Sequence, residues 1–246
     1  MSIVVRSIVF NVLFYLNLFA HLIGGLPTLL LTRGAVIAVA RSWARTNTWL
    51  LKAVCNIDIV YIGREKIPRG ALIVASKHQS LLETFALIPL FPDPLFIVKR
   101  ELMWIPFFGW YLWKAHMIPV DRGARSQALL AMTERARSEL AKGRQLIIFP
   151  EGTRTAPGAA PAYKYGVVQM YAATGAPCLP VALNSGVVWR RRSFKRYPGT
   201  VRIEVLDPIA PGIDKQAFFE RLKGEIETTT TRLIADGERE LKQQAA

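Results

Sequence analysis

The sequence predicts an α/β fold, a layered and mostly parallel sheet flanked by helices, with an N-terminal membrane-associated helical segment before it. From residue 57 onward, short apolar runs alternate with stretches of helical periodicity, which is typical of parallel strands buried on both faces. The first 54 residues differ, because they are mostly apolar and every charged residue among them is basic. We therefore expect a helical anchor over residues 1–54 and a second domain over residues 55–246.

The N-terminal segment is predicted to form two helices. No charged residue stands between Arg6 and Arg33, and this length could span a bilayer, which needs about 20 apolar residues. The run Gly24-Gly25-Leu26-Pro27 should break the helix, so we expect helices near residues 3–23 and 28–54. A cleaved signal peptide and a buried core helix are the alternatives to membrane association.

The basic residues of the second expected helix share one side of it. They fall within about one third of the helix circumference, as in a helix that lies on an anionic leaflet. Because these basic residues follow the apolar stretch, we expect the protein at the cytoplasmic face of the inner membrane. The four positions are Arg33, Arg41, Arg45 and Lys52.

Seven apolar runs are predicted as strands, and four stretches between and after them as helices. The expected strands are Ile57–Ile62, Ala71–Ala75, Leu95–Val98, Met117–Val120, Leu146–Phe149, Leu179–Leu183 and Val201–Leu206. The expected helices lie near residues 80–90, 123–142, 164–174 and 214–242. In a sheet of this kind the functional groups usually stand on loops at the carboxyl ends of strands.

Composition narrows the function to classes that handle lipid and anions. The chain has a net charge of +14 and is 51% apolar, which suits nucleic acid, an acidic membrane leaflet or a phosphorylated substrate. Its two cysteines, Cys55 and Cys178, form no disulfide framework and have no metal-ligand spacing. Its three histidines lie far apart, so we expect no metal site.

The block Ser76–Phe85 contains a candidate general base. His78 and Glu83 would point about 140° apart on one continuous helix, so they meet only if His78 precedes the helix and Glu83 lies in its first turn. Ser80 and Glu83 have the spacing of a capping box, which predicts that boundary. A carboxylate behind a histidine fixes its tautomer and stabilises the imidazolium. The alternative is that Glu83 only caps the helix and His78 is an ordinary loop residue.

Further blocks follow in a fixed order along the chain. They are Lys99-Arg100-Glu101-Leu102, Ile105–Trp110, Ile118–Arg122, Phe149-Pro150-Glu151-Gly152-Thr153-Arg154 and Cys178–Leu183. Together with the His78 block, these stretches make residues 57–210 resemble the glycerolipid acyltransferase family, and most closely its bacterial 1-acylglycerol-3-phosphate acyltransferases. The resemblance implies that residues 55–246 form the catalytic domain.

The family's H-x4-D pair implies that His78 is the base and Glu83 its partner, although Glu stands here in place of the usual Asp. Its F-P-E-G-T-R block implies substrate binding: Arg154 would hold the glycerol phosphate, and Glu151 with Gly152 would shape the pocket. A planar guanidinium suits that role because it binds phosphate through two hydrogen bonds. The remaining candidates for substrate binding are Thr153, Arg122 and Lys99.

The implied reaction is direct acyl transfer without a cofactor. The acyl group would pass from acyl-ACP or acyl-CoA to the sn-2 hydroxyl of lysophosphatidic acid, giving phosphatidic acid at an anionic membrane surface. The chain has no Gly-x-Ser-x-Gly elbow, so we expect no acyl-enzyme. We expect backbone amides at the helix start after His78 to stabilise the oxyanion. The aromatic segment 104–113 could line the acyl path, seat the domain at the interface or belong to the core.

Two alternatives remain open from the sequence. Lyso-ornithine lipid or another lysophospholipid could be the acceptor of the same chemistry. A non-catalytic basic protein that binds membranes or nucleic acid is the second, and the basic stretch Arg190–Arg192 with Lys195-Arg196 is its best support. No nucleic-acid-binding motif accompanies that stretch, so we expect no nucleic-acid partner. It better suits anionic lipid or an acidic carrier protein.

Overall fold

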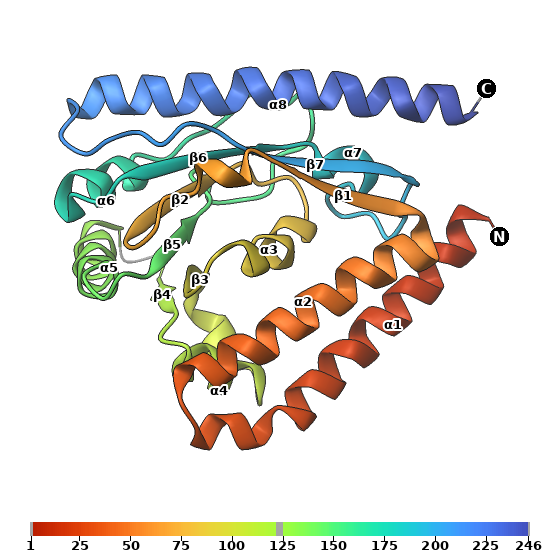
Figure 1. Ribbon diagram of the computed structural model, residues 1–246, viewed down its shortest axis with the longest axis horizontal. Coiled ribbons are helices and arrows are strands. Elements are labelled where there is room, and N and C mark those ends of the chain that lie inside the picture. Colours follow the sequence, from red (N-terminus) through yellow and green to blue (C-terminus); the bar gives the residue numbers. More distant parts are fainter. Residues whose placement is uncertain (1, 122–124, 246) are drawn as a thin grey trace.

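In the computed structural model, which describes residues 2–121 and 125–245, the strands form one sheet between layers of helices (Figure 1). Within this described part, the strand order is β1-β7-β6-β2-β5-β3-β4. All neighbours are parallel except the antiparallel pair β6 and β7, which confirms the mostly parallel sheet. The strands are β1 (Ile57–Ile62), β2 (Leu72–Ser76), β3 (Pro94–Lys99), β4 (Ile118–Val120), β5 (Gln145–Ile148), β6 (Cys178–Leu183) and β7 (Gly199–Val205).

The central strands explain why the sequence runs are so apolar. Every residue of β2, β5 and β6 is buried, because helices cover both faces of the sheet. Along β2, Leu72 and Val74 join one hydrophobic cluster and Ile73 and Ala75 the other. All seven expected strands are present, and each begins and ends within two residues of its expected position.

The helices form two layers. α8 lies along one face of the sheet over β6 and β7, and α2 and α3 lie on the other (Figure 1). The α-helices are α1 (Ile3–Gly24), α2 (Arg33–Cys55), α3 (Leu82–Ala86), α4 (Phe108–Lys114), α5 (Arg125–Leu140), α6 (Gly166–Thr174), α7 (Ser185–Val188) and α8 (Lys215–Ala245). The 3₁₀ helices are η1 (Leu26–Leu30), η2 (Arg64–Lys66), η3 (Ile88–Leu90) and η4 (Arg100–Trp104). The helical patterns of the sequence did not indicate α4 or α7.

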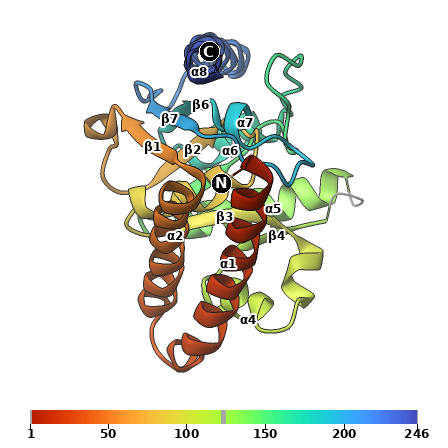
Figure 2. The same cartoon turned by 90° about the vertical axis from the view of Figure 1, so that its right-hand side faces the viewer.

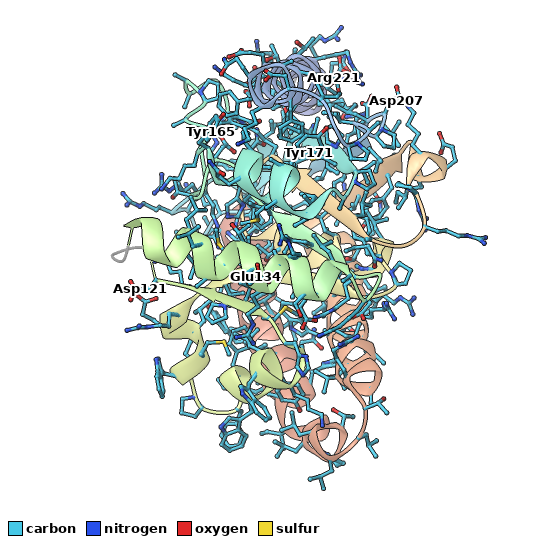
Figure 3. The ribbon with its side chains drawn as sticks, turned by 90° about the vertical axis from the view of Figure 1, so that its left-hand side faces the viewer. Asp121, Glu134, Tyr165, Tyr171, Asp207 and Arg221 are labelled. Carbon is cyan, nitrogen blue, oxygen red and sulfur yellow. The ribbon has the colours of Figure 1, made fainter. Side chains whose placement is uncertain are left out.

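The end of the sheet seen in Figure 3 is closed by α5 and α6, which lie side by side. Tyr171 of α6 lies between its own helix and α8, and its ring stacks on Phe218 with centroids 3.8 Å apart. The Tyr171 hydroxyl also accepts a hydrogen bond from the Ile213 amide at 3.1 Å. This stack fastens the start of the long α8 to the sheet.

The helices α1 and α2 form a hairpin that packs on the sheet. Phe10 and Phe14 of α1 and Leu51 of α2 share one hydrophobic cluster with the strands. The expected turn at Gly24–Pro27 is confirmed, but the second helix does not begin at residue 28. Pro27 instead lies in the first turn of η1, which delays α2 to Arg33.

One face of α1 is exposed and apolar. Among the described helices, α1 is the one that is long and apolar enough to cross a membrane. Only 17% of its most apolar 18-residue window is buried inside the protein. This helix suggests membrane association, in agreement with the sequence analysis.

Three of the four basic residues in the expected stripe of α2 bind acceptors within the protein. Arg33 forms an ion pair with Asp93 at 2.5 Å, and Arg41 donates to the Phe91 carbonyl oxygen at 2.9 Å. Lys52 pairs with Asp58 at 2.5 Å. These three cations are therefore bound to acceptors of the protein, and contact of the stripe with an anionic leaflet stays a prediction. Arg45, the fourth, is exposed.

The close packing at the hairpin turn can be tested with two adjacent glycines. A Cβ atom on Gly25 would lie 2.6 Å from the Tyr111 hydroxyl oxygen and 2.7 Å from the His21 carbonyl oxygen. Gly25→Ala should therefore lower the free energy of unfolding by about 1–3 kcal/mol, as overpacking does. A Cβ on Gly24 would meet nothing within 4 Å, so Gly24→Ala is the matched control. Denaturant unfolding in mild detergent measures both, and equal midpoints would contradict the close packing.

Candidate active site

His78 stands at the carboxyl end of β2, in the turn that leads to α3. Its Nδ1 atom lies 2.9 Å from Oε1 of Glu83, so the structure brings together the two residues that the sequence pairs. The His78 ring stacks on Phe149 from the end of β5, with centroids 4.1 Å apart and planes 18° from parallel. The ring is therefore held by a carboxylate at one nitrogen and by an aromatic face.

Glu83 is fully buried, and five donors surround its carboxylate. Oε1 accepts from His78 and from the amides of Gln79 and Ser80, at 2.6 and 2.7 Å. Oε2 accepts from the hydroxyls of Ser80 and Ser185, at 2.8 and 2.7 Å. Burial works against the charged form, but these hydrogen bonds and the nearby imidazole outweigh it and lower the pKa of Glu83. The carboxylate is therefore kept charged in a site without water contact.

Only one of the two hydrogen bonds of the predicted capping box is present at the start of α3. The Glu83 carboxylate accepts from the Ser80 amide, but the Ser80 hydroxyl accepts from the Leu82 amide at 3.0 Å and not from the Glu83 amide. The helix begins at Leu82 and its N-cap is Leu81, so Ser80 lies one residue before the N-cap position predicted for it. Because the amides of Gln79 and Ser80 are both bonded to Glu83, the expectation that amides at this helix start bind an oxyanion is wrong for these two.

The loop after β5 fixes the backbone of His78. Oε2 of Glu151 accepts from the His78 amide at 3.0 Å, and the His78 carbonyl oxygen accepts from the Thr155 amide at 2.8 Å. The expected substrate residue Glu151 is thus buried behind the histidine. Its contacts are with the protein, which makes it a positioning residue for His78.

A second buried charge cluster lies beside the histidine. Lys77 is 2% exposed, and its Nζ donates to Glu151 at 2.9 Å and to Glu227 of α8 at 2.7 Å. The Tyr163 hydroxyl donates to the same Glu227 oxygen at 2.8 Å. Burial, followed by the charge of Glu227, raises the pKa of Tyr163. The sequence analysis missed this cluster, which connects α8 to the residue before His78.

A cavity of about 850 Å³ opens beside His78. Its lining is polar around His78: Arg154 and Lys164 lie on the loop after β5, which is hydrogen-bonded to the His78 backbone, and Lys99 ends the neighbouring strand β3. We call this part the polar end. The rest is mostly apolar and is formed by the N-terminal hairpin, α4 and the strand ends. Apolar lining residues include Leu18 and Leu22 of α1, Val36, Ile37 and Trp43 of α2, and Leu112 of α4. Two further lining residues, Asp121 and Tyr165, lie at the same edge of the molecule in Figure 3.

The expected substrate residues do not all line the cavity. Gly152, like Arg154 and Lys99, lines the cavity. Thr153 is exposed and is not among the lining residues. Arg122 lies outside the described residues.

Two functional candidates escaped the sequence analysis. Lys164 lines the cavity, and its stem packs on Gly152, where a Cβ atom would lie 3.1 Å from Lys164 Cε. Ser185 follows β6 and reaches Glu83 from more than 100 residues away in the chain. The position of Ser185 just after a strand at the carboxyl edge of the sheet was the only signal for it.

The aromatic segment 104–113 lies partly in the wall of the cavity and partly on the surface. Phe108 and Tyr111 line the cavity, whereas the rings of Trp104, Trp110 and Trp113 are exposed. α4 therefore has one face toward the apolar cavity and another toward the surroundings of the protein.

His116 lies outside the strands. It occupies the turn before β4 with a φ of 57°, and its Nδ1 lies 3.7 Å from Glu139. It does not line the cavity. Among residues 2–121 and 125–245, no group of three His, Cys, Asp or Glu side chains could hold a metal ion.

Comparison with known proteins gives concordant matches. The model of the Acyltransferase family matches residues 58–184. A 1-acyl-sn-glycerol-3-phosphate acyltransferase from Pseudomonas aeruginosa is 36% identical over 167 residues, which are 68% of this chain and 65% of that protein. One from Limnanthes alba is 30% identical over 195 residues, 78% of this chain and 60% of that protein. This chain therefore aligns with less than two thirds of the length of either relative.

A solved structure has the same fold. The crystal structure of the 1-acyl-sn-glycerophosphate acyltransferase from Thermotoga maritima matches with a TM-score of 0.76. The match covers 93% of this chain and 97% of that one, at 22% sequence identity. At this identity the likeness shows the fold alone.

The pKa of Glu83 predicts a change in acid stability. It lies below the ordinary value of 4.5 in the folded protein, so the unfolded chain binds the proton more tightly. The stability that charged Glu83 contributes is therefore complete above pH about 4.5 and is lost as the pH falls through the folded pKa. Glu83→Gln cannot titrate and should flatten the fall in unfolding free energy below that pH.

Urea unfolding at a series of pH values from about 6 to 3 measures this difference. Glu65→Gln, which changes an exposed glutamate of η2, is the matched control and should keep the wild-type slope. The same slope in Glu83→Gln and wild type would mean that the carboxylate is not held charged in the folded state.

Proposed function

The chain belongs to the Acyltransferase family, and from this premise we propose that it moves a fatty acyl group from acyl-CoA or acyl-ACP to the sn-2 hydroxyl of 1-acyl-glycerol-3-phosphate, giving phosphatidic acid. One observation carries the proposal: His78 is bonded to a buried carboxylate at the polar end of an otherwise apolar cavity. The names of the bacterial and plant relatives support this acceptor.

His78 acts as the general base in this proposal. Its Nδ1–H donates to Glu83, which leaves the Nε2 lone pair to accept the proton of the acceptor hydroxyl. The hydroxyl oxygen attacks the thioester carbonyl and forms the tetrahedral intermediate. Collapse of the intermediate breaks the carbon–sulfur bond, and the imidazolium returns its proton to the leaving thiolate. The charge of Glu83 stabilises the imidazolium between these two steps.

The polar end of the cavity suits a phosphate. Arg154, Lys99 and Lys164 line it, and none of these cations forms an ion pair with a carboxylate of residues 2–121 and 125–245. A phosphate there would meet a guanidinium able to bind two of its oxygens and two ammonium groups. Arg154 is the residue we assign to the glycerol phosphate, with Lys99 and Lys164 beside it.

The apolar part of the cavity suits an acyl chain. About 850 Å³ of space is lined mainly by aliphatic and aromatic side chains of the hairpin and α4. Each methylene removed from water there contributes about 0.8 kcal/mol. Leu18, Leu22 and Trp43 belong to the hairpin, so the segment that meets the membrane also forms the wall of the lipid site. We assign the active protein to the cytoplasmic face of the inner membrane.

A matrix of donors and acceptors, assayed on purified protein, tests the reaction. Acyl-CoA and acyl-ACP are each combined with lysophosphatidic acid and with lyso-ornithine lipid. Turnover should be highest with lysophosphatidic acid, and His78→Ala should lower it by at least about a hundredfold, the usual contribution of a general base.

The control variant is His116→Asn, because His116 lies outside the cavity and Asn tolerates its positive φ. It should keep wild-type turnover. Preference for lyso-ornithine lipid would reassign the acceptor, and substantial turnover by His78→Ala would refute the general-base mechanism.

Arg154→Ala tests the phosphate contact. Loss of a charge-assisted hydrogen bond costs about 1.5–3 kcal/mol, so KM for lysophosphatidic acid should rise by about 10- to 100-fold. KM for the acyl donor should change little. Arg69→Ala removes an exposed arginine outside the cavity and serves as control. A rise confined to the donor KM would assign Arg154 to the thioester side.

A further inference from the structure

A basic loop follows α7, and the proposed reaction assigns no role to it. Between residues 152 and 203 the sequence contains no Asp or Glu. Within that stretch, four cations of the loop are exposed, and the ring of Phe194 among them is 52% exposed. We call these residues the basic loop; its cations are Arg190, Arg191, Arg192 and Lys195.

The basic loop is fastened to the first half of α1. The Arg196 amide donates to the Ser7 hydroxyl at 2.8 Å, and its guanidinium donates to Asn11 Oδ1 at 3.0 Å. That guanidinium also lies 3.7 Å above the Trp189 ring. Figure 2 shows the chain after α7 running beside the N-terminal half of α1. The loop cations therefore have a defined place along this helix.

The neighbouring face of α1 is apolar and exposed over its whole length. Its exposed side chains recur at the three- and four-residue spacing of one helix face. Arg6 is the one charged residue in α1, and no acidic residue precedes Asp58 in the sequence. The exposed apolar row includes Val5, Ile8, Val12, Leu16, Phe19 and Ile23.

We propose that the basic loop binds the anionic headgroups of a bilayer on which the exposed face of α1 lies. The surface of a bilayer has a layer of charged headgroups above an apolar acyl region. The exposed apolar helix enters the acyl region, and the cations beside it meet the headgroup charge. The exposed Phe194 ring within the loop suits an interface between water and lipid. Protein acceptors engage three of the cations of α2, whereas the four cations of this loop are exposed.

The location of the loop connects membrane binding to the active site. α7 begins with Ser185, which holds Glu83, and ends just before Trp189 and the basic loop. The purpose of the contact rests on the proposed function, because a lipid acceptor must enter from a membrane. Binding to vesicles requires no turnover, so the two proposals can fail separately.

Vesicle sedimentation of the full chain tests the proposal. Vesicles of phosphatidylcholine alone are compared with vesicles that also contain phosphatidylglycerol. Replacing all four loop cations with Gln should weaken binding to the anionic vesicles by at least about tenfold, since each basic residue near an anionic surface contributes about fivefold. Binding to the neutral vesicles should not change, and added salt should weaken wild-type binding to anionic vesicles alone.

The matched control replaces four exposed cations on elements other than α1 and the basic loop, namely Arg64, Arg69, Arg135 and Lys215, with Gln. It has the same net charge as the loop variant and should bind anionic vesicles as wild type does. Equal binding by the two variants would overturn the proposal, because net charge alone would then account for binding. Wild-type vesicle binding by the loop variant, with kcat/KM reduced for acyl-ACP but not acyl-CoA, would also overturn it and assign the loop to an acidic carrier protein.

Discussion

A carboxylate with no exposed surface must be surrounded by donors, and this requirement organises the site around Glu83. Its five hydrogen bonds come from the β2–α3 turn and from Ser185 after β6. They turn the backbone at Gln79 and Ser80 and orient the His78 ring. Glu has a longer side chain than the family's usual Asp. The turn accommodates it by closing tightly around the carboxylate, which still meets the histidine.

The second buried charge cluster extends this constraint across the sheet. Glu151 holds both the His78 amide and the Lys77 ammonium group, and Lys77 in turn binds Glu227 of α8. A buried lysine needs such partners, because removing its charge from water without them is costly. As a result, the backbone of the turn that carries His78 depends on a helix on the opposite face of the sheet.

The N-terminal hairpin contributes both to the exposed surface and to the wall of the cavity. Its exposed face is apolar, and its inner face lines the cavity through residues such as Leu22 and Trp43. In the proposed reaction, a lipid acceptor that leaves the bilayer along this hairpin would keep its acyl chain in apolar surroundings, because both environments exclude water. The polar end of the cavity, with Arg154 and His78, would then meet only the part of the lipid that carries phosphate and hydroxyl groups.

From the sequence alone one could predict the seven strands, the α/β class and the pairing of His78 with Glu83, since strand burial and turn spacing are local properties. The sequence also pointed to Arg154 and Lys99, which stand in recognisable blocks and line the cavity. Only the tertiary structure decided the partners of Glu83 and Lys77, the cavity wall supplied by α1 and α2, and the internal ion pairs of Arg33 and Lys52. These contacts join residues that are distant in the chain or on different elements. Which donor reaches which acceptor depends on how the elements pack, and no local pattern of residues records that.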